Sequence, residues 1–368
     1  MRFLMLNWRD PGNPKSGGAE RVSRAYLGEL VRRGHEVFWY ANNFPGAKPE
    51  ETYDGIKIIR GGGMGSSVWQ AVKWHRRYKP FDLIIDQHHG IPWYAPWWSG
   101  TNVVAYIHEV LGPIWKSFYP QPVSTLGMWQ ERRTIWCYRN VPFWTPSEST
   151  QRLLKSLGVR HVNVFPNGVD TTPLPDLEPK PLESPLRLIT VCRLAPNKRV
   201  DHAISALRLL LNQGVDANLT IVGSGEVERQ LRQSASDSGL QNKITFTGHL
   251  SEVQKNAALQ RAHFLLHTSQ REGWGLNVIE ANAMGTPAIV YPVDGLVDST
   301  VNGVTGFVTK EETPESIARV LAEATKDVSR YEQYRQNAWE RSKTFAWKQV
   351  LPPACNWLEE RARGRKQA

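Results

Sequence analysis

The stretch Leu186–Glu226, LRLITVCRLAPNKRVDHAISALRLLLNQGVDANLTIVGSGE, decides the fold of this chain. It holds an apolar run over Leu186–Arg193, a helical pattern over Val200–Asn212 and a second apolar run over Ala217–Val222, which ends in a glycine turn. Strands that are joined through a helix pair in parallel. The stretch therefore predicts a parallel sheet that carries helices on its faces.

The same alternation continues on both sides of this stretch. Toward the carboxyl end, strands are expected at Ile244–Thr247, His263–Thr268 and Ala288–Val290, and helices at Val227–Ser238, at Glu252–Arg261, from about Leu276 and from Pro314. Toward the amino end, strands are expected at Arg2–Asn7, His35–Tyr40, Ile56–Arg60, Leu83–Asp86 and Val103–His108, and helices at Ala19–Arg33 and Ser66–Tyr78. The fold class is therefore α/β, with two doubly wound parallel-sheet domains.

A proline-rich segment separates the two patterns. Five prolines fall between Pro173 and Pro185, and they exclude a helix there. The expected domains are 1–172 and 186–345, with 173–185 as the linker and 346–368 as a carboxyl-terminal extension. Two doubly wound domains that face each other form a deep cleft, and ligands of such sheets bind beyond the carboxyl ends of the strands.

Composition sets limits on the class of protein. The 368 residues are 40% hydrophobic and 22% charged, which is typical of a globular chain. The three cysteines are far apart, so we expect neither a disulfide framework nor a zinc site, and a cytoplasmic location follows. Met1–Trp8 is interrupted by Arg9 and is no signal peptide, while Gly90–Ile107 contains too many glycines and prolines to span a membrane.

The positive charge is concentrated in the first half of the chain. Residues 1–168 have a net charge of +9 out of the total of +10, and they contain 11 of the 15 tryptophans. A basic, aromatic surface of this kind suits nucleic acid, an anionic membrane or a phosphorylated substrate. Trp74–Lys79 and Trp93–Trp98 combine rings with cations or lie in loops, as membrane-interface anchors do.

Four loops carry residue types that suit an anionic, hydroxyl-rich ligand. Gly17 and Gly18 precede the first helix, whose free N–H groups can bind an anion. Arg193 and Lys198 follow a strand, and two cations at this position suit a diphosphate. Gly223 and Gly225 form another strand–turn–helix junction, but Glu228 stands where a dinucleotide fingerprint has its third glycine.

The fourth loop is the stretch Arg271–Ala281, REGWGLNVIEA. Glu272 lies in the loop, Gly275 precedes the helix and Glu280 lies on it, so seven residues separate the two carboxylates. Carboxylates accept hydrogen bonds from the diol of a ribose or a hexose.

In this order, and together with Pro166–Asp170, these segments resemble the retaining glycosyltransferases of family 4, which have the GT-B fold of two facing Rossmann-like domains. The resemblance covers essentially the whole chain. It implies an amino-terminal acceptor domain, a carboxyl-terminal donor domain, and a final helix that crosses back to the first domain.

The resemblance also implies a role for individual residues. Arg193 and Lys198 bind the donor diphosphate, Glu272 binds the sugar, and Glu280 binds the ribose. His108 lies beside the reacting sugar, although Glu109 stands where many relatives have aspartate. The donor-binding set is completed by the backbone of Gly17, Gly18, Gly223, Gly275, Leu276 and Asn277.

The expected reaction moves a hexose from a UDP- or GDP-sugar, such as UDP-glucose or GDP-mannose, to an acceptor hydroxyl with retention and without a metal or other cofactor. The product belongs to a cell-surface polysaccharide, a glycolipid or a lipid-linked glycan, made at the inner face of the cell membrane. A soluble small-molecule or aromatic acceptor and a GT-B-type sugar-nucleotide epimerase remain alternatives. A nucleic-acid partner is not expected, because the chain carries no recognition module.

Overall fold

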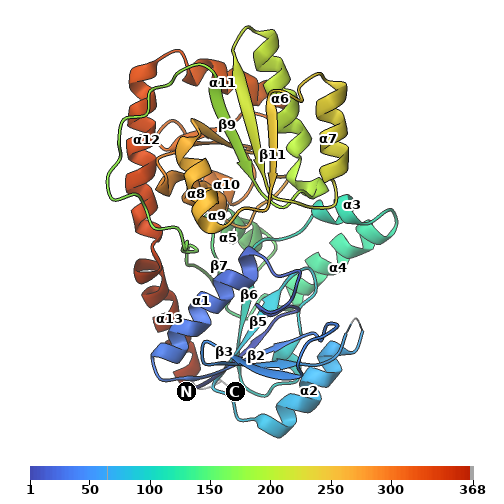
Figure 1. Ribbon diagram of the computed structural model, residues 1–368. Coiled ribbons are helices and arrows are strands. Elements are labelled where there is room, and N and C mark those ends of the chain that lie inside the picture. The colour runs from blue at the N-terminus through green and yellow to red at the C-terminus, as the bar shows by residue number, and fades with distance from the viewer. Residues whose placement is uncertain (64, 365–368) are drawn as a thin grey trace. The chain divides into compact units, whose positions relative to one another are not determined.

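The computed structural model describes residues 1–63 and 65–364 (Figure 1), which form two compact units. Unit 1 comprises Met1–Trp115, Gln121–Gly168 and the chain from Trp347 onward, and unit 2 comprises Lys116–Pro120 and Val169–Ala346. Domain limits are expected from the sequence at residues 172, 185 and 345, and these limits stay predictions.

Unit 1 is built on an eight-stranded sheet with the order β3-β4-β2-β1-β5-β6-β7-β8. Neighbouring strands are parallel, except that β3 pairs antiparallel with β4. The strands are β1 (Arg2–Leu6), β2 (Glu36–Ala41), β3 (Glu50–Tyr53), β4 (Ile56–Arg60), β5 (Leu83–His88), β6 (Asn102–Ile107), β7 (Phe143–Thr145) and β8 (Val162–Val164). The central β1 and β5 are buried almost throughout, as the apolar runs predict.

The helices of unit 1 connect these strands. They are α1 (Gly18–Arg32), α2 (Ser67–Tyr78), the short η1 (Ala95–Trp97), α4 (Val123–Cys137), α5 (Glu148–Ser156) and α13 (Trp347–Arg363), while α3 (Ile114–Phe118) crosses from unit 1 into unit 2. Helix α13 packs on α1, where Arg33 Nη1 donates to Asn356 Oδ1 over 2.7 Å. The carboxyl-terminal helix is therefore part of unit 1.

Unit 2 is built on a six-stranded, all-parallel sheet with the order β11-β10-β9-β12-β13-β14. Its strands are β9 (Leu186–Val191), β10 (Ala217–Val222), β11 (Ile244–Gly248), β12 (Phe264–His267), β13 (Ala288–Val290) and β14 (Gly306–Val308). Its helices are η2 (Pro196–Lys198), α6 (Val200–Asn212), α7 (Glu228–Asp237), α8 (Glu252–Arg261), α9 (Leu276–Ala283), α10 (Leu296–Ser299), α11 (Pro314–Ala324), α12 (Val328–Ser342) and η3 (Lys343–Phe345). The prediction of two doubly wound α/β sheets is confirmed.

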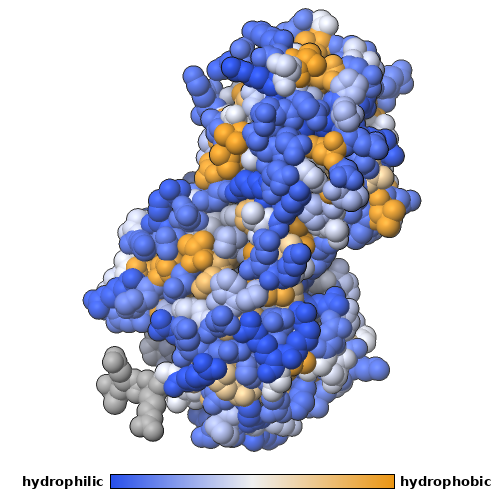
Figure 2. All heavy atoms as spheres, turned by 90° about the vertical axis from the view of Figure 1, so that its left-hand side faces the viewer, coloured by the Kyte–Doolittle hydropathy of each residue, from blue (hydrophilic) through white to orange (hydrophobic). Residues whose placement is uncertain are grey.

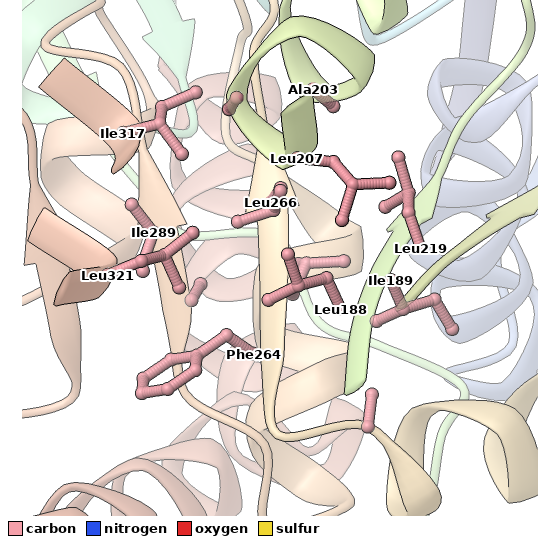
Figure 3. Close-up of a cluster of buried hydrophobic side chains, with 14 of the residues drawn as sticks. Leu188, Ile189, Ala203, Leu207, Leu219, Phe264, Leu266, Ile289, Ile317 and Leu321 are labelled. Carbon is pink, nitrogen blue, oxygen red and sulfur yellow. The ribbon is translucent and has the colours of Figure 1, made fainter. Parts of the chain in front are cut away.

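One hydrophobic core joins the helices of unit 2 to its sheet. In Figure 3, Ala203 and Leu207 of α6 and Ile317 and Leu321 of α11 lie against side chains of the sheet, among them Leu266 and Ile289. The proline-rich segment carries no helix, as predicted, and its Leu174 and Leu182 pack against this same core. The segment therefore packs within unit 2.

Local sequence sets the helix starts in unit 2. The Ser251 hydroxyl accepts from the Gln254 N–H at the start of α8, and Thr313 accepts from the Ser316 N–H before Pro314 opens α11. On the face drawn in Figure 2, hydrophobic residues form small separate groups among hydrophilic ones. Within residues 1–63 and 65–364, no helix combines the length and the apolar character that a membrane span requires.

Candidate active site

The loop after β9 carries the two predicted cations of unit 2. Lys198 ends the short η2 helix, and α6 begins two residues later at Val200. The Arg193 side chain is exposed and, within residues 1–63 and 65–364, makes no hydrogen bond or ion pair; only its backbone carbonyl accepts, from the N–H of Ala195 over 2.9 Å. The Arg193 guanidinium is thus available to an anion.

Lys198 pairs with the predicted sugar-binding carboxylate. Lys198 Nζ lies 2.6 Å from Glu272 Oε2, and about four-fifths of each side chain is buried. Burial alone raises the pKa of Glu272, but the Lys198 ammonium overcomes this and holds that pKa below its ordinary value. The loops after β9 and β12 therefore bring a cation and an ionised carboxylate together.

A buried histidine supports this pair from the sheet side. His267 ends β12, and its Nε2 lies 3.5 Å from Glu272 Oε2. Burial lowers the pKa of His267 to about 4, so the imidazole is neutral near pH 7. It also bonds to the side chain of Asn277, whose Nδ2 donates to the carbonyl of Val191 over 2.7 Å.

The neutral state of His267 makes stability depend on pH. Its pKa falls from 6.5 in an open chain to about 4 in the folded state, so unfolding takes up a proton between these values. The contribution of neutral His267 to the free energy of unfolding is therefore fully present above about pH 6.5, and it is lost as the pH falls toward 4. We expect His267→Gln to cost less stability at pH 5 than at pH 7.5 in thermal unfolding. An equal deficit at both pH values would contradict the neutral assignment.

The start of α9 presents the predicted backbone donors. Gly275 caps the helix with a φ of 83°, where a Cβ would lie 2.9 Å from the Leu296 side chain. This left-handed turn leaves the N–H groups of Leu276 and Asn277 in the first turn of α9, where an isolated helix has no partners for them.

The predicted ribose-binding glutamate is deeply buried. Glu280 Oε2 lies 2.9 Å from Lys255 Nζ of α8, and both side chains are less than a tenth exposed. Lys255 also pairs with Glu252 at 2.8 Å. Glu280 therefore has a different cation from Glu272, and the two carboxylates occupy separate environments along one loop and helix.

Arg199 is a site residue that the sequence analysis missed. It has a φ of 48°, and it links the loop after β9 to the loop after β12. Its Nε donates to the Thr268 carbonyl over 2.9 Å, and its Nη2 donates to the Ser269 carbonyl over 3.0 Å. In the sequence, Arg199 is visible only as a third cation directly after Lys198. Nothing there distinguishes a loop-bridging arginine from one that is solvated.

Gly223 lies where β10 approaches the loop after β9. Its φ of 125° and the closeness of the Cys192 carbonyl leave no room for a side chain. Gly225 is similarly close to the carbonyl of Leu194. These glycines allow the two loops to touch, which is the structural use of the predicted glycine turn.

In unit 1, the glycine loop is held by a buried ion pair. Arg60 Nε and Nη2 each lie 2.7 Å from an oxygen of Asp10, and neither side chain is more than 2% exposed. Asp10 also accepts from the N–H of Gly12 over 2.8 Å. The loop leads to Gly17, whose N–H donates to Glu20 Oε2 over 2.7 Å, so it is this residue's neighbour Gly18 that opens α1.

The predicted His108 lies directly after β6. It is half-buried, and its Nδ1 lies 3.5 Å from the Tyr106 hydroxyl.

Asp86, near the end of the neighbouring β5, is a second residue that the sequence analysis missed. It accepts from the N–H groups of Trp93 and Ala95 and from the Tyr138 hydroxyl, at 2.9, 3.0 and 2.7 Å. Burial raises the pKa of Asp86 to about 6. The carboxylate holds the loop after β5. In the sequence, Asp86 can be recognised as an acidic residue at the end of an apolar run.

The predicted site residues are thus divided between the units. Unit 1 holds Gly17, Gly18 and His108, and unit 2 holds the others. Within unit 2, Lys198 and Glu272 are in contact, Arg193 shares the Lys198 loop, and Gly275, Leu276, Asn277 and Glu280 share the start of α9.

Two family models match the chain, one in each half. Residues 16–173 match the family model described as Glycosyltransferase Family 4, and residues 177–341 match the one described as Glycosyl transferases group 1. The chain is 28% identical to a glycogen synthase of Mycobacterium tuberculosis over 400 residues, which cover all of this chain and 96% of that protein.

The name of a second relative from the same organism includes a lipid. It is a GDP-mannose-dependent alpha-(1-6)-phosphatidylinositol dimannoside mannosyltransferase, 27% identical over 92% of this chain and 91% of its own length. Among solved structures, HepE from Anabaena in complex with UDP and glucose matches with a TM-score of 0.72 and 18% identity, over 98% of this chain and all of that one. A sucrose-phosphate synthase from Thermosynechococcus elongatus matches with a TM-score of 0.78 and 17% identity, over 98% of each chain.

Proposed function

The chain belongs to the family 4 glycosyltransferases of the GT-B fold, and from that premise we propose that it moves a hexose from a nucleoside diphosphate sugar to an acceptor hydroxyl with retention at the anomeric carbon. The donor is a UDP- or GDP-sugar such as UDP-glucose or GDP-mannose. GDP-mannose stands in the name of one relative, and UDP and glucose are bound in one structural neighbour.

The contact between Lys198 and Glu272 carries this proposal. A cation and a carboxylate 2.6 Å apart suit the junction at which a sugar joins its phosphate. The ammonium of Lys198 and the exposed guanidinium of Arg193 bind the diphosphate, and the carboxylate of Glu272 accepts hydrogen bonds from sugar hydroxyls. The first-turn N–H groups of α9 add positive potential for the phosphates.

The proposed mechanism rests mainly on electrostatics. When the bond from the anomeric carbon to the phosphate oxygen breaks, negative charge develops on the diphosphate, and Arg193 and Lys198 stabilise it. Retention by double displacement requires a carboxylate nucleophile at the anomeric carbon, and we assign none. Instead the acceptor attacks from the face that the phosphate leaves, and the departing phosphate oxygen takes the acceptor proton. His108 lies beside the reacting sugar in this account.

We propose that the acceptor belongs to a cell-surface polysaccharide, a glycolipid or a lipid-linked glycan, and that the protein works from the cytoplasm on the inner face of the cell membrane. The name of the phosphatidylinositol dimannoside mannosyltransferase supports a lipid-linked acceptor, and the positive charge of residues 1–168 supports an anionic surface.

A transfer assay tests the proposed reaction. The protein is incubated with radiolabelled UDP-glucose or GDP-mannose and a bacterial membrane extract, and label is counted in the lipid and polysaccharide fractions. Label from one donor is expected there, and the anomeric configuration of the product, read by NMR, is expected to match that of the donor. Inverted product would contradict retention. A changed nucleotide sugar formed without acceptor would replace transfer with epimerisation, and label only on soluble small molecules would replace the acceptor class.

Metal independence is a separate prediction. Two cations and a helix start take the place that a divalent ion has in other transferases, so the transfer rate is expected to change by less than about twofold in EDTA. The measurement is the initial rate of transfer after dialysis against EDTA, with and without added Mg²⁺. Loss of activity in EDTA and its return with Mg²⁺ would contradict the prediction.

A further inference from the structure

Helix α4 of unit 1 exposes its large apolar side chains and buries polar ones. Its buried residues are Ser124, Glu131, Thr134 and Ile135. By contrast, Leu126, Trp129 and Trp136 are 63%, 56% and 54% exposed. A helix that only covers a sheet shows the opposite arrangement. Ile135 packs in the core of unit 1, whereas Leu126, Trp129 and Trp136 do not.

The exposed residues form one continuous stripe. At 3.6 residues per turn, Leu126, Trp129, Arg133 and Trp136 fall within about 80° of the helix circumference. We call the set Leu126, Trp129, Arg132, Arg133 and Trp136 the α4 face. Arg132 and Arg133 are exposed, and Arg133 lies 5.3 Å from the centre of the Trp129 ring. Just beyond the helix, Arg139 lies 3.9 Å from the centre of the Trp136 ring.

The α4 face carries cations and no carboxylate. Glu131 is the one acidic residue of α4, and it points inward, where it accepts from the N–H groups of Leu111 and Gly112 at 2.8 Å each. A third bond comes from Trp115 Nε1 at 3.2 Å. Because Glu131 points inward and binds the backbone of Leu111 and Gly112, the exposed arginines have no acidic neighbour on α4.

We infer that the α4 face is the surface by which unit 1 docks on an anionic lipid bilayer. Tryptophan rings favour the headgroup level of a membrane, and arginines beside them reach lipid phosphates. This inference deepens the proposed function, since it rests on the membrane placement given there and names the surface responsible. It concerns binding to the bilayer, not the glycosyl-transfer step.

Charge favours a bilayer over a second copy of the chain. In a two-fold symmetric dimer that joins one α4 face to another, Arg132 and Arg133 would meet the same arginines, without a carboxylate to pair with them. An anionic membrane supplies the missing negative charge. The rings then enter the interface without desolvating unpaired cations.

The membrane anchors expected from the sequence are only partly exposed. Trp93 is fully buried and stacks on Trp8, with ring centres 4.6 Å apart, so the prediction is wrong for this residue. Trp74 is half-buried and stacks on Tyr78 at 4.7 Å. Among Trp93–Trp98, Trp97 is the strongly exposed tryptophan.

Vesicle co-sedimentation tests the inference with the full chain. The variants are Trp129→Ala/Trp136→Ala and Arg132→Gln/Arg133→Gln, all at exposed positions, so we expect them to keep the fold. Trp69→Ala is the matched control, because Trp69 on α2 is 60% exposed and has the Lys73 ammonium 3.4 Å from its ring centre. The vesicles contain either phosphatidylcholine alone or a mixture with phosphatidylglycerol.

The wild type is expected to prefer the anionic vesicles. The double tryptophan variant is expected to bind them at least about tenfold more weakly, and the double arginine variant about fivefold more weakly per arginine, with a smaller salt dependence. Trp69→Ala is expected to bind within about twofold of the wild type. Equal losses in Trp69→Ala and in the α4 variants, or no binding by the wild type, would overturn the inference.

Two controls separate this outcome from the proposed reaction. Stabilisation by UDP or GDP is expected to be unchanged in the α4 variants, so loss of vesicle binding with intact nucleotide binding removes the docking surface only. Vesicle binding without nucleotide binding would remove the transferase assignment and leave the docking surface. A wild-type dimer that the tryptophan variant converts to a monomer, measured by light scattering, would assign the α4 face to a second copy and overturn the inference.

Discussion

Lys198→Ala is expected to lower kcat/KM for sugar transfer by about 10²–10³-fold, the range found when one electrostatic contact to a developing oxyanion is removed. In the folded protein Lys198 is the cation that contacts Glu272, so its loss affects both the diphosphate and the orientation of the carboxylate. The cost in stability is expected to be only about 1–2 kcal/mol, because both side chains keep some contact with solvent. Steady-state transfer kinetics and thermal unfolding measure the two effects.

Lys243→Ala is the matched control for this prediction. Lys243 pairs with Asp216 in the same unit, but both side chains are more exposed and lie away from the loops after β9 and β12. Its activity is expected to stay within about twofold of the wild type. If Lys198→Ala loses stability and not turnover, then the ion pair with Glu272 is structural, and the catalytic assignment fails.

Arg60→Ala is expected to destabilise unit 1 by about 3–5 kcal/mol, because it leaves the Asp10 carboxylate buried without its cation. The fall in melting temperature is about 2–4 °C for each kcal/mol in a domain of this size. Arg60→Lys is expected to restore little of this stability, since an ammonium cannot make the two parallel bonds to Asp10. Thermal and urea unfolding measure the effect.

Arg24→Ala provides the comparison for this second prediction. Arg24 pairs with Asp54 at 2.6 Å, but the side chains are 39% and 53% exposed, so the expected cost is at most about 1 kcal/mol. A similar small cost for Arg60→Ala would mean that Asp10 finds water or another partner. The glycine loop that leads to Gly17 would then be held by its backbone bonds alone.

Sequence periodicity predicts the parts of the fold whose apolar residues face a core. The strands of unit 2 and helix α6 lie close to their expected ranges, because each buries one apolar run or stripe. Helix α4 gives no such signal, since its large apolar residues are outside and Ser124, Glu131 and Thr134 are inside. The short β7 and β8, with three residues each, hold too few residues to show a period of two.

Chemistry at the loops is predictable by residue type, but its pairing is not. A cation after β9 and a carboxylate after β12 can be read from the sequence, whereas the contact between Lys198 and Glu272 depends on how the two loops fold. Arg199 joins these loops through its side chain, while its backbone is left-handed. Arginine rarely adopts that conformation, so the sequence does not predict it. The pairing of Glu280 with Lys255 likewise needs the packing of α8 against α9.

The central claim is that the loops of unit 2 bind a nucleoside diphosphate sugar through Arg193 and Lys198. The most direct measurement is thermal unfolding of the wild type and of Lys198→Ala with UDP, GDP or ADP in excess, in the presence of EDTA. At about a hundred times its dissociation constant, one nucleotide is expected to add about 2.7 kcal/mol to the stability of the wild type and clearly less to that of the variant. No stabilisation by any nucleotide, or equal stabilisation of both proteins, would contradict the claim.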